Sequence, residues 1–118
     1  MLEGKKYDLE ERTTLFAEAV ISFAQPLPKN LITIPIISQL VRAGTSVGAN
    51  YCEANDAESK KDFRHKIGIC KKEAHESKYW LRIIKQAVPE SAPTAQKLWQ
   101  EAKELTLIFH KITQTATE

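Results

Sequence analysis

Basic side chains recur along one stretch of the sequence at intervals that match the turns of a helix. Arg64, Lys71 and Lys78 are seven residues apart, and Arg82 follows four residues later. Since an α-helix has 3.6 residues per turn, these side chains share one face, which we expect to meet water or an anionic partner. From Lys60 to Lys85, nine basic residues stand against three acidic ones, a net charge of +6 in a chain of net charge +2.

Two explanations of this basic face remain open from the sequence. The first is electrostatic binding of RNA or DNA, which would be weakly sequence-specific and strongly salt-dependent. No aromatic residue is interleaved with the four basic positions, so stacking against bases is not expected. The second is a solvated helix face, which is the more common origin of a lysine-rich surface.

Another polar row lies on the preceding segment with three- and four-residue spacing. It consists of Gln39, Arg42, Ser46, Asn50 and Glu53. Glutamine, serine and asparagine compete with the helical backbone for hydrogen bonds, so an ordinary solvent face favours lysine and glutamate instead. The row is therefore interpreted either as a solvent face or as a specific hydrogen-bonding or assembly surface.

Three charged residues of the following segment belong with this polar row: Lys72, Glu73 and Glu76. A charge kept from water needs an opposite charge or several hydrogen bonds. Arg42 and Lys72 can therefore partner Glu53 or these two glutamates, within a subunit or across an interface. Such roles are structural rather than catalytic.

The sequence carries no motif that would indicate an enzyme. A ribonuclease of the HEPN helical class requires Arg-x4-His, and the nearest match, Lys71 to His75, has the wrong residue and spacing. A di-metal bundle requires two Glu-x-x-His pairs, whereas only Asp62-x-x-His65 occurs, away from the apolar stripe. No phosphate-binding loop or nucleophile motif is present. We expect a non-enzymatic protein without cofactor or metal.

Cysteine usage and hydropathy indicate a soluble cytoplasmic protein. Cys52 and Cys70 lack the spacing of a metal site and are expected to be reduced, buried thiols. The amino-terminal residues contain no apolar run typical of a signal peptide, and no segment approaches the roughly 20 apolar residues of a membrane span. No membrane association is expected.

Helical periodicity predicts an all-α fold in a single domain, 1–118. Prolines at 26, 28, 35, 89 and 93 leave four long uninterrupted segments. We expect helices over 8–25, 33–55, 60–88 and 92–114, with Asp8, Thr33 and Ser59 as amino-terminal caps. Short connections favour an antiparallel up-down-up-down four-helix bundle.

The third predicted helix has two apolar surfaces. Its core stripe follows three- and four-residue steps through Phe63, Ile67, Cys70, Ala74, Ser77, Leu81, Ile84 and Val88. A second flank carries Ile69, Tyr79, Trp80 and Ile83. One stripe is enough for a monomeric bundle, so the second flank is a candidate interface between subunits.

Two segments resemble the bacterial four-helix-bundle proteins of the 23S rRNA intervening-sequence family. The family pattern on the second helix, Gln-x-x-Arg-x-x-x-Ser-(Val/Ile)-x-x-Asn-x-x-Glu-(Gly/Ala), is matched by Gln39, Arg42, Ser46, Val47, Asn50, Glu53 and Ala54. On the third helix, Lys-Glu-Ala-x-Glu-(Thr/Ser)-x-(Tyr/His)-Trp-Leu is matched from Lys72 to Leu81. Ala54 departs from the glycine of many relatives.

The resemblance implies an up-and-down bundle that assembles into a homo-oligomer, usually a pentameric ring, which agrees with the second apolar flank. The resemblance implies little about the chemical activity of the protein, although distant relatives bind nucleic acid through a basic surface. Two functions are therefore carried forward. One is a non-enzymatic oligomer that binds RNA or DNA through its basic face, and the other is an adaptor oligomer that recruits an unidentified protein and binds no nucleic acid.

Overall fold

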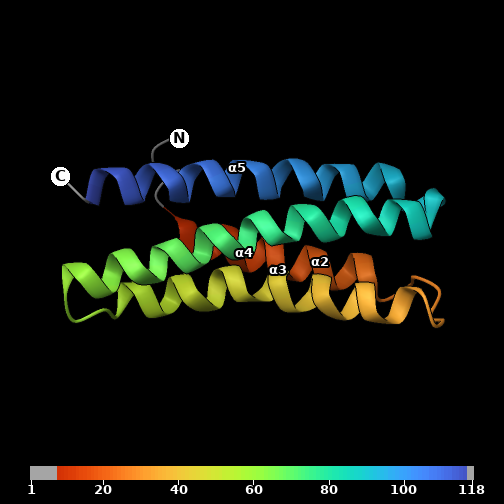
Figure 1. Cartoon of the computed structure of the whole chain (residues 1–118), viewed down its shortest axis with the longest axis horizontal. Coiled ribbons are helices and arrows are strands. Elements are labelled where there is room, and N and C mark those ends of the chain that lie inside the picture. The colour runs from red at the N-terminus through yellow and green to blue at the C-terminus, as the bar shows by residue number, and fades with distance from the viewer. Residues whose placement is uncertain (1–7, 117–118) are drawn as a thin grey trace.

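The computed structural model describes residues 8–116, which form four long α-helices and no strand within that range (Figure 1). The helices are α2 (Leu9–Ala24), α3 (Thr33–Asn55), α4 (Lys60–Ala87) and α5 (Ala92–Ala116), with a short 3-10 turn, η1 (Pro89–Ser91), before α5. All bounds fall within two residues of those expected from periodicity and proline positions. Residues 1–7 and 117–118 of the expected domain lie outside the described range.

Two of the three expected helix caps are present. Asp8 Oδ1 accepts a hydrogen bond from the Glu11 backbone N–H at 3.2 Å, and Ser59 Oγ accepts one from Asp62 N–H at 3.0 Å. The expected Thr33 cap is wrong, because Asn30 Oδ1 instead accepts from the N–H of Ile32 and Thr33, both at 2.9 Å. Thr33 is the first helical residue, and its hydroxyl donates to the Pro28 carbonyl at 2.6 Å.

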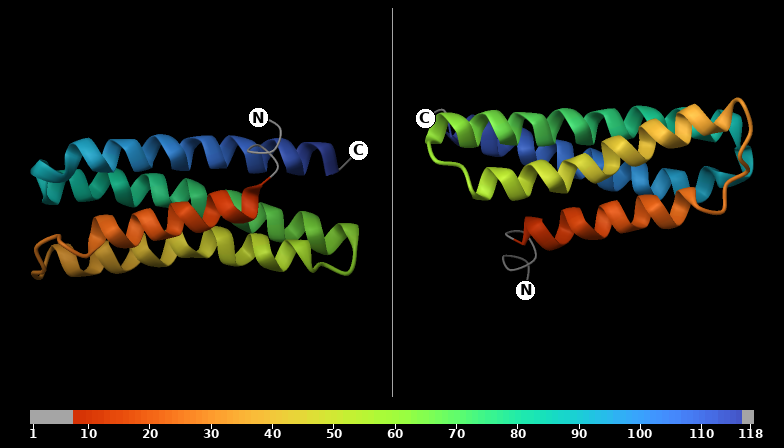
Figure 2. Two further views of the ribbon diagram at one scale, coloured as in Figure 1. Left: turned by 180° about the vertical axis from the view of Figure 1, so that it is seen from behind. Right: turned by 90° about the horizontal axis from the view of Figure 1, so that it is seen from below.

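Helix α4 packs against both α3 and α5, and α2 packs against α3 and more lightly against α5. Figure 2 shows this from behind, where α2 runs between α3 and α5 on the side of the bundle away from α4. Contacts between neighbouring helices run in opposite directions along the sequence. Arg42, early in α3, pairs with Glu73 of α4, whereas Glu53, late in α3, pairs with the earlier Lys66 of α4. Along α4 and α5, Lys71 meets His110 whereas Lys85 meets Gln96. This order fixes which charges face one another.

The core stripe of α4 is buried from Ile67 to Val88, and Phe63 is half-buried at its start. Burial raises the pKa of the Cys70 thiol to about 12, so this thiol is protonated at neutral pH. The expectation that Cys52 is also buried is wrong, because Cys52 is exposed. Tyr51 and Ala54 occupy the inward positions of that turn, which leaves Cys52 on the outer side.

Two glycines of α3 allow α2 to approach closely. A Cβ atom added at Gly44 would lie 3.0 Å from Val20 Cγ2, and one added at Gly48 would lie 3.0 Å from Thr13 Oγ1. Gly68 of α4 differs, because a Cβ added there would meet no atom of another helix within 4 Å. Packing thus explains the glycines of α3, and it does not explain Gly68.

We predict that adding a side chain at Gly44 and at Gly68 changes the free energy of unfolding in opposite directions. Gly44→Leu should destabilise the protein, since overpacking a core typically costs about 1–3 kcal/mol. Gly68→Ala should stabilise it by up to about 1 kcal/mol, the helix-propensity difference between the two residues. Urea unfolding followed by circular dichroism measures both changes, and a stabilised Gly44→Leu protein would contradict the close approach of α2.

Candidate nucleic-acid interface

The basic residues of α4 lie along α5 and are less exposed than the sequence indicated. Lys71 Nζ lies 2.9 Å from His110 Nδ1, and Lys85 Nζ donates to Gln96 Oε1 at 3.1 Å. Arg64, Lys71 and Lys78 are half-buried, and only Arg82 of the four expected positions is exposed. This face is therefore partly covered by α5, and both explanations offered by the sequence, an anionic partner and a solvated surface, remain predictions.

Trp99 of α5 lies within this basic surface. Lys78 Nζ from α4 is 5.3 Å from the centre of the Trp99 ring, and Lys103 Nζ from α5 is 5.7 Å from it. Both distances are within the range of a cation–π contact. No aromatic residue is interleaved with the basic positions of α4 itself. Only the packing of α5 brings Trp99 and Lys103 to that surface.

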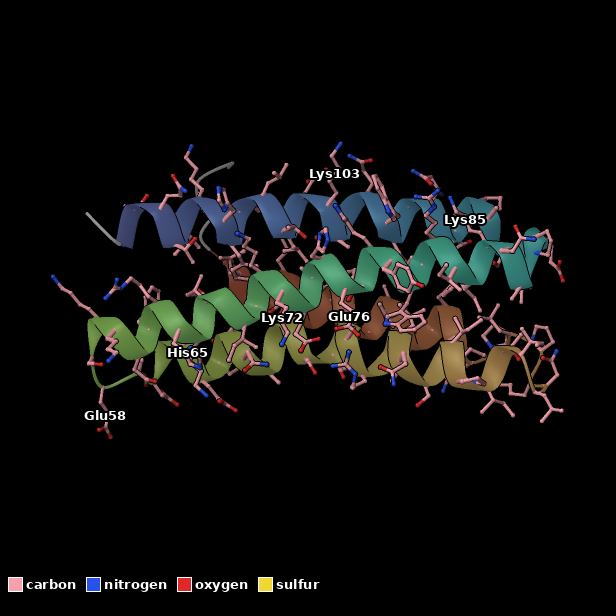
Figure 3. All side chains as sticks on the ribbon, in the orientation of Figure 1. Glu58, His65, Lys72, Glu76, Lys85 and Lys103 are labelled. Carbon is pink, nitrogen blue, oxygen red and sulfur yellow. The ribbon has the colours of Figure 1, made fainter. Side chains whose placement is uncertain are left out.

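We call this surface the α4/α5 groove and define it by the residues that meet along it. From α4 these are Gly68, Lys71, Lys72, His75, Lys78 and Lys85, and from α5 they are Gln96, Trp99, Lys103, Thr106, His110 and Thr113. None of these residues is acidic. Figure 3 shows Lys85 and Lys103 at separate places along the two helices.

The acidic side chains of α4 and α5 are engaged elsewhere in the bundle. Arg12 of α2 binds Glu101 at 2.7 and 2.9 Å and Glu104 at 2.8 Å. Arg42 of α3 binds Glu73 at 3.1 Å and also binds Glu76. These four glutamates account for all acidic residues of the two helices except Asp62, which lies in the first turn of α4. The groove therefore keeps its positive charge.

The polar row of α3 forms hydrogen bonds within the helix and with α4. The Arg42 guanidinium donates to Gln39 Oε1 at 3.0 Å as well as to the two glutamates of α4. The Ser46 hydroxyl donates to the Arg42 carbonyl at 2.6 Å, and the Asn50 amide donates to the Ser46 carbonyl at 2.9 Å. The hydrogen bond that the Arg42 guanidinium donates to Glu76 is the main cause that raises the pKa of Arg42.

The remaining charged residues of the candidate set lie at the ends and edges of this row. Glu53 Oε1 accepts a hydrogen bond from Lys66 Nζ at 2.6 Å, instead of pairing with Arg42 or Lys72 as the sequence indicated. Lys72 is exposed, and its charge contributes to lowering the pKa of Glu76. Figure 3 shows Lys72 and Glu76 one turn apart on α4.

Trp80 connects the polar row to the second apolar flank of α4. Its indole Nε1–H donates to Glu76 Oε2 at 3.0 Å, and its ring contacts Tyr79 edge to face at 4.9 Å. Ile69 and Ile83 are half-buried, and Tyr79 is exposed. Leu31, Ile32 and Ile34 are also exposed and were not expected from the sequence. Because they lie beside a proline-rich loop, helical periodicity gave no reason to single them out.

Residues 8–116 contain no group of three side chains arranged to hold a metal ion. Within the same range, no helix is both long and apolar enough to cross a membrane. What the described surface offers a ligand is ammonium, imidazole and indole groups in the groove, and exposed apolar side chains outside it.

The family model for the 23S rRNA-intervening sequence protein matches residues 5–111. The chain belongs to that family. A solved structure of an S23 ribosomal protein family member of unknown function, from Bacteroides thetaiotaomicron, is similar to it over 93% of this chain and 98% of the other, with 26% sequence identity and a TM-score of 0.83. No curated protein matches the chain. Family membership agrees with the resemblance read from the two helical motifs, and the four-helix bundle agrees with the fold implied by it.

We predict that the hydrogen bond from Trp80 makes folding stability depend on acid pH. It is the main cause that lowers the pKa of Glu76 below its ordinary value of 4.5, followed by the hydrogen bond from Arg42. The unfolded chain therefore takes up a proton on Glu76 first, so stability should fall as the pH drops below about 4.5. In Trp80→Phe this fall should be smaller, as measured by urea unfolding between pH 7 and pH 3.

Trp99→Phe is the matched control, because the Trp99 ring contacts lysines and not a carboxylate. It should keep the acid dependence of the unmodified protein. Equal acid dependence in all three proteins would show that the Trp80 hydrogen bond does not influence the protonation of Glu76.

Proposed function

We propose that this family member is a non-enzymatic, cytoplasmic bundle that binds RNA through the α4/α5 groove. One observation carries the proposal: two lysines from different helices converge on Trp99, and no carboxylate of α4 or α5 belongs to that surface. Two ammonium groups near one ring repel each other, and a phosphate placed between them relieves that repulsion. DNA offers the same phosphates and is the alternative nucleic acid.

The proposed binding is mainly electrostatic. Each phosphate that a lysine or arginine neutralises releases counterions, so affinity falls steeply with salt. Trp99 adds a surface on which an exposed base can stack, a contact worth about 1–3 kcal/mol per base in single-strand binders. An unpaired strand is therefore favoured over a duplex, because duplex bases are not accessible for stacking.

We further propose an antiparallel up-down-up-down arrangement and assembly into a homo-oligomer, as a pentameric ring. The opposite order of residue contacts along α3, α4 and α5 supports the antiparallel arrangement. The exposed Leu31, Ile32, Ile34 and Tyr79 support an interface between subunits. A ring would repeat the α4/α5 groove in each subunit and raise the affinity for a long strand through multivalency.

A second function is favoured by the same exposed apolar residues. If they remain uncovered after assembly, they form a surface for an unidentified protein partner, and the oligomer acts as an adaptor that binds no nucleic acid. The polar row of α3 then serves assembly. Light scattering coupled to size exclusion, with and without a single-stranded RNA at low and moderate salt, distinguishes the two functions. A salt-sensitive mass shift supports RNA binding, and an unchanged mass at every salt concentration supports the adaptor.

We predict that Lys78→Gln/Lys103→Gln weakens RNA binding and its salt dependence. The double variant removes both ammonium groups beside Trp99, and each lost phosphate contact should reduce the slope of log affinity against log salt by about 1. Fluorescence anisotropy with a labelled single-stranded RNA at several salt concentrations measures both quantities.

The control carries the same change of charge outside the groove. Lys61 and Lys97 are exposed and make none of the groove contacts, so Lys61→Gln/Lys97→Gln should bind RNA more tightly than the groove variant. An equal loss in the two double variants would indicate attraction by net charge alone and would overturn the assignment to the groove.

We also predict that Ile34→Glu weakens subunit assembly. Ile34 is about half exposed at the start of α3, so a glutamate there should leave the bundle folded while placing a charge in the proposed interface. Light scattering should report a smaller particle, with circular dichroism as the control for folding. An unchanged particle mass would remove Ile34 from the interface.

A further inference from the structure

Gly68 lies in the middle of α4 with no packing reason for a glycine. In a helix interior, glycine is about 1 kcal/mol less favourable than alanine. Close contact with α2 compensates for this cost at Gly44 and Gly48, where an added Cβ would lie 3.0 Å from the nearest atom. At Gly68 no atom of another helix lies within 4 Å of that position. A glycine without such a contact leaves the helix surface open to something outside the bundle.

Basic side chains surround this open position on the same helix. Four residues before Gly68 stands Arg64, and three, four and seven residues after it stand Lys71, Lys72 and His75. These spacings place the four side chains around Gly68 on the helix surface. Arg64 Nε is buried and has no hydrogen-bond partner in the described part of the chain. Lys71, Lys72 and His75 form no ion pair with a carboxylate among residues 8–116.

Gly68 also borders a surface cavity of about 400 Å³ between α4 and α5. Its lining is Gly68, Lys71, Lys72 and His75 from α4, with Thr106 and Thr113 from α5. The two threonine hydroxyls donate to the carbonyls of Ala102 and His110, each at 2.7 Å, so their hydrogens are already engaged. The free donors at this cavity therefore come from the basic residues of α4.

The contact between Lys71 and His110 holds one ammonium group beside the cavity. An ammonium group can only donate, so His110 Nδ1 accepts at their separation of 2.9 Å. The imidazole fixes the position of Lys71 without neutralising its charge. Lys72 also lines the cavity, and its charge contributes to lowering the pKa of Glu76. The cavity is therefore lined by two lysines, of which Lys71 forms no ion pair with a carboxylate among residues 8–116.

We infer that this cavity is a phosphate-binding subsite, in which a phosphate group lies over Gly68 and is held by Lys71, Lys72 and His75. The absence of a side chain at Gly68 lets the phosphate oxygens approach the helix surface. The phosphate belongs either to the backbone of a bound RNA or to a free phosphorylated compound. The first case rests on the proposed function and deepens it by locating one phosphate of the strand.

The first experiment follows glycine amide signals by nuclear magnetic resonance during titration with inorganic phosphate. The sequence contains four glycines, so labelling with 15N-glycine gives a simple spectrum. The Gly68 signal, assigned by its loss in Gly68→Ala, should shift on adding phosphate. The signals of Gly44 and Gly48, which face α2, serve as internal controls and should not shift. Equal shifts of all three signals, or none, would overturn the subsite.

The second experiment measures RNA affinity of Gly68 variants by fluorescence anisotropy. Gly68→Glu should weaken binding at least about tenfold, because it fills the cavity with a negative charge; tenfold corresponds to about 1.4 kcal/mol. Gly68→Ala should also weaken binding although it stabilises the fold. Gln96→Glu introduces the same charge at the far end of the α4/α5 groove and should cause a smaller loss. An equal loss in Gln96→Glu and Gly68→Glu would overturn the subsite.

Three outcomes separate this inference from the proposed function. If phosphate shifts Gly68 and competes with RNA, the subsite holds a phosphate of the strand. If phosphate shifts Gly68 but no RNA binds, the subsite is upheld for a free phosphorylated compound and the proposed function fails. If RNA affinity depends on Lys78 and Lys103 but not on Gly68, the proposed function stands and the subsite is overturned.

Particle mass tests whether Gly68 instead lies in a contact between subunits. Light scattering should give the same mass for Gly68→Ala and Gly68→Glu as for the unmodified protein. A smaller particle in Gly68→Glu would assign this surface to a contact between subunits, and that outcome would also overturn the subsite.

Discussion

Burial of the core stripe of α4 between α3 and α5 determines the arrangement of charge in this protein. Once Ile67, Leu81 and Ile84 face inward, the orientation of the whole helix is set, and its polar residues are divided between two neighbours. Glu73 and Glu76 face α3, whereas Lys71, Lys78 and Lys85 lie along α5. Rotation of α4 that exchanged these sides would expose the apolar stripe, at roughly 25 cal/mol per Å² of apolar surface.

Two arginines from the other helices complete this separation of charge. Arg12 binds two glutamates of α5, and Arg42 binds two glutamates of α4. Such partly exposed ion pairs contribute little to stability, typically about 0–1 kcal/mol each. Their larger effect concerns the potential of the surface. Because the carboxylates are held by α2 and α3, they do not neutralise the lysines of the α4/α5 groove.

The sequence predicted what a single helix determines and missed what depends on a neighbour. Helix ranges, the buried stripe of α4 and the family could be predicted, because periodicity, prolines and motif spacing are properties of one segment. Trp99 and Lys103 could not be placed beside Lys78, because that contact depends on the relative position of two helices along their axes. At the start of α3, two side chains could accept hydrogen bonds from the free backbone amides, and Asn30 does so rather than Thr33. The opening beside Gly68 likewise required the position of α5.

The hydrogen bonds of the polar row also give the two sides of α4 opposite chemical character. On the side of α3, the Ser46 hydroxyl hydrogen is used by the Arg42 carbonyl, and the Arg42 guanidinium is used by Gln39 and the two glutamates. On this side, the guanidinium and the carboxylates compensate one another across the two helices. On the side of α5, Lys71, Lys78 and Lys85 meet imidazole, indole and amide groups, none of which carries a negative charge. One helix therefore separates a flank of paired charges from a flank of unpaired ones, and an anion that approaches it is attracted to one flank only.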